Sequence, residues 1–187
     1  MRIAKVLPIA SVFAALLAMP ANADDVSDAI AKAQTAYNEG KVGEAKTNLD
    51  MAIALLAQKN AERLKALLPA APDGWTATDG ETSAIPMGGI TVSRRYSKDD
   101  KTVEIQLVTD SPMMAMMMSL FTNPQMAIMS GAKIQNVGAQ QVMITQQGDV
   151  QALVANKYLL TFNGSAPSED KLTFAGLIDY AALTAFQ

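Results

Sequence analysis

The spacing of apolar residues changes once along this chain, and that change restricts the fold more than any other feature of the sequence. From Asp25 to Leu68 apolar residues recur every three or four positions, which predicts amphipathic helices. From Ile90 onward several segments alternate apolar and polar residues, which predicts half-buried strands. The stretch 69–89 between them is rich in Pro, Gly, Asp and Thr, and it predicts a connector with a first strand.

The helical stretch is predicted to form an antiparallel hairpin. Its first helix ends at Asn38-Glu39-Gly40, because glycine readily adopts the left-handed conformation that closes a helix. Pro69 and Pro72 end the second helix. The apolar positions of that second helix form one stripe, made of Val42, Ala45, Leu49, Ala52, Ile53, Leu56, Leu64, Leu67 and Leu68.

The hairpin resembles a single tetratricopeptide repeat, the helical-hairpin unit of peptide-binding solenoids. The resemblance depends on Ala33, Ala36, Tyr37, Gly40, Glu44, Ala45, Leu49 and Ala52. Such units stack in threes or more to bury their faces, and the sequence holds no second copy. The resemblance therefore implies no peptide-binding superhelix, and we expect the hairpin to dock on the following domain or on a second subunit.

Beyond the connector, the order of elements is two strands, a helix, four strands and a helix. The predicted strands are Ile90–Tyr96, Val103–Leu107, Lys133–Val137, Gln141–Thr145, Val150–Ala155 and Tyr158–Asn163. A helix covers 111–130 with an interruption near Asn123-Pro124, and a last helix runs from a capping Ser168 to about Phe186. This order favours an α+β fold, in which an N-terminal helical hairpin precedes a twisted antiparallel sheet with packed helices.

Two further resemblances concern the whole chain. The order of elements is similar to the PsbP-like α/β/α sandwich of small accessory and binding proteins. The chain also resembles uncharacterised exported proteins of proteobacteria, in its Leu-Leu-Pro before Gly74-Trp75 and in its Asp110-Ser111-Pro112-Met113 ahead of the methionine-rich helix. Neither resemblance implies an activity. Residues 24–68 are the predicted hairpin, and residues 69–187 are the predicted sandwich domain.

The first 23 residues have the pattern of a cleaved secretory signal peptide. Arg2 and Lys5 precede an apolar run, and Ala21-Asn22-Ala23 supplies the small residues that signal peptidase recognises. The apolar run is shorter than the roughly 20 residues that span a bilayer, which argues against a retained anchor. We therefore expect cleavage after Ala23, a periplasmic location and no membrane anchor after cleavage.

The residue types missing from the chain exclude many functions. It contains neither histidine nor cysteine, which removes the usual zinc sites, imidazole bases, thiol nucleophiles, disulfides and covalent haem. Acidic residues outnumber basic ones, 18 to 15, without long runs of either sign, so we expect no nucleic-acid partner. No cofactor is expected, and an exported chain without cysteine must be stabilised by packing alone.

A carboxylate-based enzyme or a serine–lysine dyad remains as an alternative. The candidate carboxylates are Asp99, Asp100, Glu104 and Asp110, of which the first two lie in a predicted turn where aspartate is common. Arg94 and Arg95 should point to opposite faces of their strand. We expect Arg94, on the apolar face, to pair with a carboxylate, because an unpaired buried charge is costly.

Seven methionines between Met113 and Met129 are the most unusual feature of the sequence. At about 100° per residue, Met113, Met116, Met117 and Leu120 share one face of a helix, and Met114, Met118 and Phe121 share an adjoining face. A helix on a sheet buries one such stripe, so something else must cover the second. The N-terminal hairpin, a partner and Cu(I) are the three alternatives, since thioethers pack adaptably and are soft ligands.

The sequence therefore predicts a non-enzymatic periplasmic protein that acts through an apolar, methionine-rich helix. The predicted binding residues are Met113, Met114, Met117, Met118, Phe121, Met126 and Met129. The partner could be a protein or an apolar small molecule, and self-association is compatible with the pattern. A Cu(I)-binding protein is the alternative without catalysis.

Overall fold

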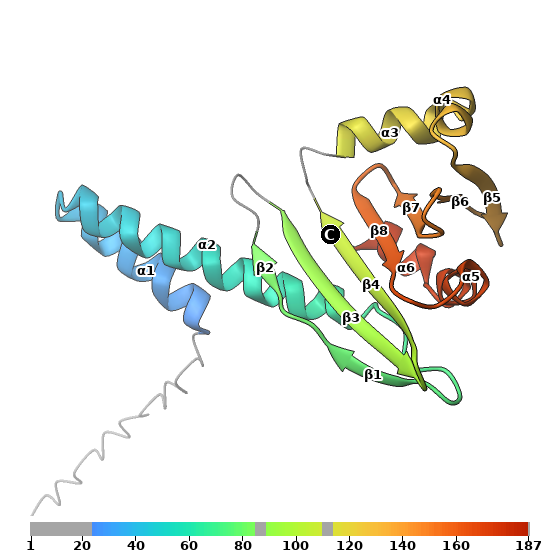
Figure 1. Ribbon diagram of the computed structural model, residues 1–187. Coiled ribbons are helices and arrows are strands. Elements are labelled where there is room, and N and C mark those ends of the chain that lie inside the picture. Colours follow the sequence, from blue (N-terminus) through green and yellow to red (C-terminus); the bar gives the residue numbers. More distant parts are fainter. Residues whose placement is uncertain (1–23, 85–88, 110–113, 187) are drawn as a thin grey trace, which may run out of the picture. The chain divides into compact units, whose positions relative to one another are not determined.

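A computed structural model describes residues 24–84, 89–109 and 114–186 of this chain (Figure 1). The fold is α+β, with an N-terminal helical pair and an antiparallel sheet that carries further helices, as the sequence predicts. The chain divides into two compact units, residues 1–52 and residues 53–187, and the division falls inside the second helix.

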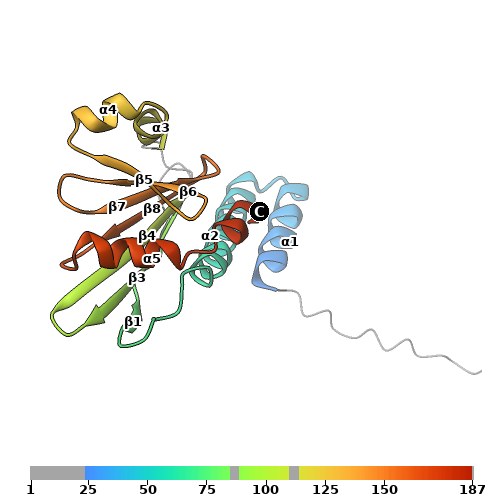
Figure 2. The ribbon, with the colours of Figure 1, turned by 90° about the vertical axis from the view of Figure 1, so that its right-hand side faces the viewer.

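Helix α1 spans Asp25–Asn38, and helix α2 spans Val42–Lys65. The carboxylate of Asp24 accepts the backbone N–H of Ser27 and so caps α1. Gly40 has a φ of +76°, and the N–H of Lys41 donates to the carbonyl of Ala36 at 2.9 Å, which closes the helix in the predicted way. Within the first unit α1 lies alongside α2 (Figures 1 and 2).

The residues buried in the hairpin are mostly small. They are Val26, Ala29, Ala33 and Ala36 of α1, with Ala45 and Ala52 of α2. The larger members of the predicted stripe are exposed instead, among them Val42 and Leu49. Within the first unit the alanines of this stripe are therefore buried and its long side chains reach solvent, whereas Leu64, further along α2, is buried.

Eight strands form the sheet of the second unit. They are β1 Thr76–Asp79, β2 Ser83–Ala84, β3 Ile90–Lys98, β4 Lys101–Thr109, β5 Lys133–Val137, β6 Gln140–Ile144, β7 Val150–Val154 and β8 Tyr158–Asn163. The order is β1-β3-β4-β8-β7-β6-β5, with every pair antiparallel and β2 also paired to β3. Strand β8 thus joins the β3–β4 hairpin to the β5–β7 meander, with Glu104 opposite Asn163.

One face of this sheet carries the main core. Alternate residues of β4 and β8, such as Ile105 and Phe162, are fully buried there. Helices α5 (Ser168–Gly176) and α6 (Tyr180–Ala185) contribute to the same core. The ring of Phe174 lies 4.5 Å from that of Tyr96 and 5.0 Å from that of Trp75, between ring centroids. Trp75 is therefore partly buried and packs against the edge of this core.

The end of α2 belongs to this core as well, because Ala61, Leu64 and Leu68 are buried in it. The side chain of Arg94 holds the chain beyond α2 in place: its Nη1 donates to the carbonyls of Leu68 at 3.0 Å and Pro69 at 3.2 Å. The Tyr96 hydroxyl donates to the same Pro69 carbonyl at 2.6 Å. These bonds satisfy two backbone carbonyls of the connector that follows α2, since buried backbone carbonyls need hydrogen-bond partners.

The C-terminal segment differs from the single helix that the sequence suggests. Ser168 does not cap α5, because Pro167 holds the cap position and the Ser168 hydroxyl donates to the Gly148 carbonyl at 3.0 Å. The helix also ends at Gly176, and a second one begins after Asp179, whose carboxylate accepts the N–H of Ala182 at 2.8 Å. The prediction of one continuous helix was wrong, because Asp179 caps a second helix.

Candidate interaction surface

The methionine-rich segment forms two short helices, α3 (Met114–Thr122) and α4 (Pro124–Met129). Asn123 separates them and caps α4, with its side-chain oxygen accepting the N–H of Met126 at 3.4 Å. Pro124 follows in the first helical position, where a missing N–H costs nothing. The interruption lies where the sequence predicts it.

A second, smaller cluster of buried residues anchors these helices on the sheet. Ala127, Ala132 and Met143 form it, and Leu120, Phe121 and Ile134 pack against it. Met143 follows Val142 in β6, and Val142 belongs to the main core, so the two side chains lie on opposite faces of the sheet. Helices α3 and α4 therefore pack on the face opposite to the main core.

The predicted binding residues of α3 are only partly accessible. Met114 is buried, with 6% of its surface exposed, while Met118 and Phe121 are half-buried. Met114 therefore contributes to packing and cannot serve as the contact residue that the sequence suggests. Met113 and the side chain of Met117 lie outside the described residues.

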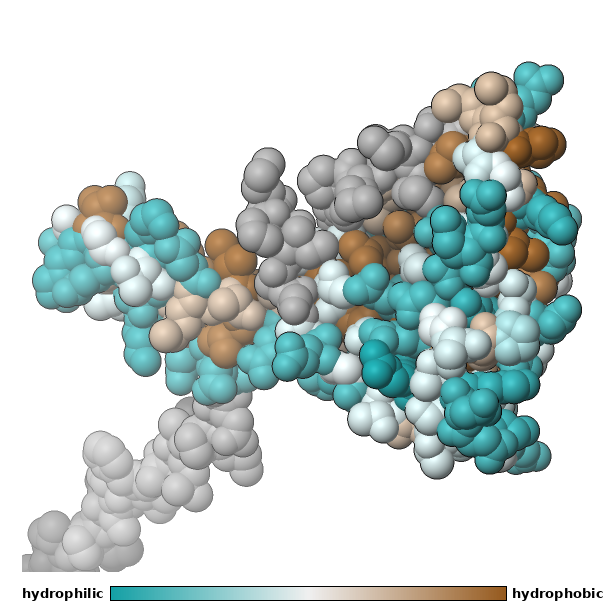
Figure 3. All heavy atoms as spheres, viewed as in Figure 1, coloured by the Kyte–Doolittle hydropathy of each residue, from teal (hydrophilic) through white to brown (hydrophobic). Residues whose placement is uncertain are grey.

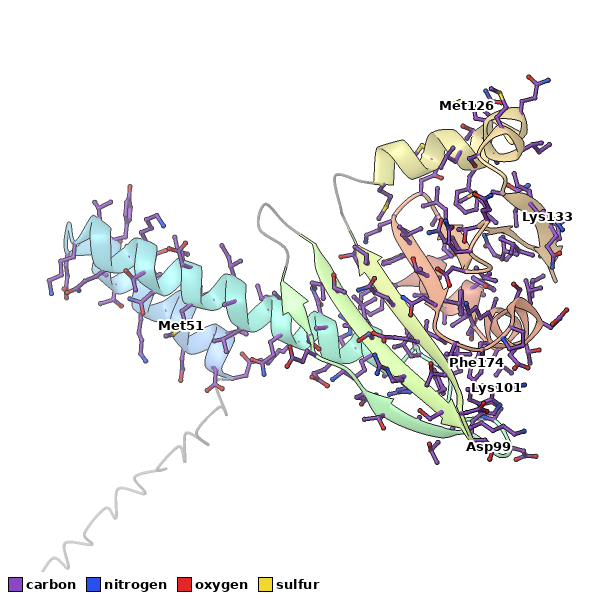
Figure 4. All side chains as sticks on the ribbon, in the orientation of Figure 1. Met51, Asp99, Lys101, Met126, Lys133 and Phe174 are labelled. Carbon is purple, nitrogen blue, oxygen red and sulfur yellow. The ribbon has the colours of Figure 1, made fainter. Side chains whose placement is uncertain are left out.

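Among the described side chains of this segment, exposed apolar residues lie on α4. Met126, Ile128 and Met129 expose 47%, 68% and 87% of their surfaces, whereas Ala127 between them is fully buried. Apolar spheres lie over α4 in Figure 3, and Figure 4 labels Met126 there. We call these three residues the α4 surface. Met126 and Met129 are among the predicted binding residues, whereas Ile128 is not, because the abundance of methionine gives no signal for an isoleucine on the same short helix.

Several carboxylates of the sheet unit line one cavity, where an enzyme could use them. Asp79, Glu81 and Glu104 line a cavity of about 520 Å³ together with Arg95. Arg94 Nε donates to Asp79 at 2.5 Å and so lowers the pKa of that carboxyl, and Arg95 Nη2 donates to Glu104 at 2.6 Å. A general acid in a glycosidase needs a raised pKa, so the lowered pKa of Asp79 argues against that role.

The two arginines lie on opposite faces of β3, as predicted, and each pairs with a carboxylate. Asp99 adopts a positive φ of 54° in the exposed β3–β4 turn, and Asp100 follows it there, as expected of turn residues. Asp110 lies outside the described residues.

A serine and a lysine occupy one turn of α5, at Ser168 and Lys171. Lys171 is 3% exposed, and its Nζ donates to Asp149 at 2.7 Å and to the Gly148 carbonyl at 3.4 Å. Ser168 donates to the same carbonyl. Both side chains direct their hydrogen bonds to the β6–β7 turn, which assigns them to the packing of α5 on that turn instead of to a nucleophile and its base.

The described ranges contain neither a metal-binding cluster of acidic residues nor a membrane-spanning helix. The Asp and Glu side chains there form no group of three that could hold a metal ion. No helix of that part of the chain is both long and apolar enough to cross a bilayer. Comparison with protein-family models, with curated proteins and with solved structures finds no match for this chain.

Proposed function

We propose that this chain is an exported, non-enzymatic interaction protein that binds a partner protein through the α4 surface. The observation that carries the proposal is the exposure of Met126, Ile128 and Met129 on a helix that Ala127 and Phe121 fix to the sheet. Contiguous exposed apolar side chains on a fixed element are typical of binding sites. Methionine suits such a surface because its flexible thioether adapts to different partners.

A protein is a better occupant than a small molecule for geometric reasons. A small ligand needs a concave site that encloses most of its surface. The α4 surface is instead one side of a six-residue helix, and its side chains point outward to an exposure of up to 87%. A groove or flat patch on another protein can receive such a helix.

Site-specific photo-crosslinking tests this proposal. A photoreactive residue in place of Ile128 or Met129 is expected to give a discrete adduct in cells, and the same residue in place of Asp99 serves as the matched control, since Asp99 lies on an exposed polar turn of the same unit. Excess unlabelled protein should compete for the adduct, while the Met126→Gln, Ile128→Gln, Met129→Gln variant should not. Equal crosslinking at all three positions would refute the proposal.

Export is a separate part of the proposal and has its own test. The pattern of the first 23 residues supports it. Mass spectrometry of the protein recovered from the periplasmic fraction should give Asp24 as the N-terminal residue. Retention of residues 1–23, or recovery from the cytoplasm alone, would contradict export.

A further inference from the structure

We infer that the partner contacts this chain with an extended segment, which adds to the sheet as a further strand alongside β5. This mode of binding rests on the proposed function, since the same segment lies against the α4 surface. Strand addition draws affinity from main-chain hydrogen bonds and specificity from alternate side chains. The sheet unit provides for both at the end where β5 lies (Figure 1).

Strand β5 has main-chain groups without a partner in the described part of the chain. It is the last strand of the sheet and pairs with β6 only. Val137 and Gln140 close the hairpin of these two strands around a two-residue turn, so they exchange hydrogen bonds, and bonded residues alternate from there. Gln135 therefore also bonds to β6. Ile134 and Asn136 direct their N–H and C=O groups outward, and we call these four groups the β5 edge.

The opposite end of the sheet is less suited to an added strand. There β1 and β2 both pair with β3, so that edge is divided into a piece of four residues and a piece of two. Strand β5 instead runs for five residues in unbroken register with β6. Edges that avoid pairing carry prolines, bulges or several charges, and β5 has only Lys133, at its first position. The β5 edge is therefore open to pairing.

The two sides of β5 offer different surroundings to an added strand. Ile134 packs on the cluster that holds α4, so α4 lies on that side and next to β5 (Figures 1 and 2). On the other side, Lys133 and Gln135 line a mostly polar cavity of about 580 Å³ together with Gln146 and Glu169. Because side chains alternate between the faces of a sheet, an added strand presents every second residue to α4 and the others to this cavity.

The chemistry of these two sides predicts the sequence of the segment. Its residues on the side of α4 should be apolar, because Ile128 and Met129 expose 68% and 87% of their surfaces there. Its residues on the side of the cavity should be polar, because Lys133 and Glu169 offer charges of both signs. The β5 edge thus favours a segment that alternates apolar and polar residues. An amphipathic helix has apolar residues every three or four positions and does not fit this pattern.

Selection from a displayed library of short random peptides, with the purified protein as bait, tests this inference. The selected peptides should alternate apolar and polar residues. A synthetic peptide of the selected sequence should bind Asn136→Pro at least about tenfold more weakly, because proline lacks one outward N–H of the β5 edge. Asn136→Ala is the matched control, since it keeps that N–H and should change the affinity less than about threefold. Ile128→Gln should weaken binding as well.

Hydrogen exchange followed by NMR provides a readout that needs no substitution, in case Asn136→Pro disturbs the fold. The peptide should slow the exchange of the N–H groups of Ile134 and Asn136, which have no partner in the sheet. The N–H groups of Gln135 and Val137 are already bonded to β6, so the peptide should change their exchange by a smaller factor.

The inference is overturned if no peptide is selected or if the selected peptides have apolar residues at helical spacing. It is also overturned if a folded Asn136→Pro variant binds as tightly as the unchanged protein, or if exchange at Ile134 and Asn136 stays the same. The proposed function survives each of these results when the photo-crosslinked adduct at Ile128 forms. A missing adduct refutes both.

Discussion

The hairpin and the sheet unit solve the problem of burial in opposite ways. In the sheet unit the largest side chains, Tyr96, Tyr158, Phe162 and Phe174, are almost completely buried. In the hairpin the buried residues are mostly alanines, and Tyr37 and Leu49 are exposed. Because stabilisation grows with the apolar area removed from water, burial stabilises the sheet unit more than it stabilises the hairpin.

The largest effect is expected in the aromatic core. Phe174, which Figure 4 labels, is 1% exposed, and its ring contacts those of Trp75 and Tyr96, so Phe174→Ala removes a buried side chain. The cavity should lower the free energy of unfolding by about 3–5 kcal/mol. The matching change in the hairpin, Leu49→Ala, should cost the protein no more than about 0.5 kcal/mol. Urea denaturation of both variants measures the difference, and equal losses would invalidate the comparison.

The buried lysine should give the next largest effect. Asp149→Asn removes the negative partner of Lys171, whose ammonium is 3% exposed, and should destabilise the protein by about 2 kcal/mol. Asp170→Asn is the control, because its partner Lys101 is 47% exposed, and such pairs contribute less than about 1 kcal/mol. A loss for Asp149→Asn no larger than that of the control would show that the buried contact is not tighter than a surface one.

Burial of two tyrosine hydroxyls should make the stability of the sheet unit depend on alkaline pH. Burial raises the pKa of Tyr96 and of Tyr180, both in the sheet unit, to about 12 from a usual value of 10.0. Because the folded-state pKa is raised, each hydroxyl stabilises the fold fully below about pH 10, and this stabilisation is lost as the pH rises towards 12. Urea denaturation at a series of pH values should therefore show a free energy of unfolding that falls over this range. An unchanged free energy of unfolding would contradict the burial of the two hydroxyls.

The smallest effect is expected in acid. The hydrogen bond from Arg94 lowers the pKa of Asp79 from 3.8, so the pair stabilises the fold above that pH and loses its effect as the pH falls through the lowered pKa. Asp79 is 46% exposed, which limits the contribution to less than about 1 kcal/mol. Asp79→Asn should reduce the dependence of stability on pH between about pH 5 and 2. An unchanged dependence would refute this role.

Particular elements show what the sequence can predict. Strands β5 and β8 have the predicted ends, Gly40 has the predicted left-handed conformation, and Arg94 has the predicted carboxylate partner. The strands depend on alternation, the conformation of Gly40 on the backbone freedom of glycine, and the pairing of Arg94 on the cost of burying a charge. All three causes are properties of the residues themselves. The break between α5 and α6 also has a local cause, because the side chain of Asp179 caps α6. An aspartate ahead of a helical segment is a sequence signal that could have predicted this break.

The candidate site was less predictable, because exposure depends on neighbours that are distant in the sequence. Met114 and Met129 are the same residue type in one predicted segment, yet they expose 6% and 87% of their surfaces. Met143 lies in β6, beyond this segment in the sequence, and it forms part of the cluster that α3 and α4 pack against. No periodicity within residues 111–130 identifies which turn of helix will meet that cluster.

By itself, the sequence determined most of the elements of this protein, its α+β class and the catalytic groups that it lacks, because side-chain period and residue type are properties of the chain alone. The tertiary structure decided that β8 pairs with β4, that Ala45 and Ala52 of α2 are buried while Val42 and Leu49 are exposed, and that α4 presents Ile128 with two methionines. Burial is a relation between segments: a side chain is covered only when another part of the fold approaches it, and the pairing of strands far apart in sequence sets that approach.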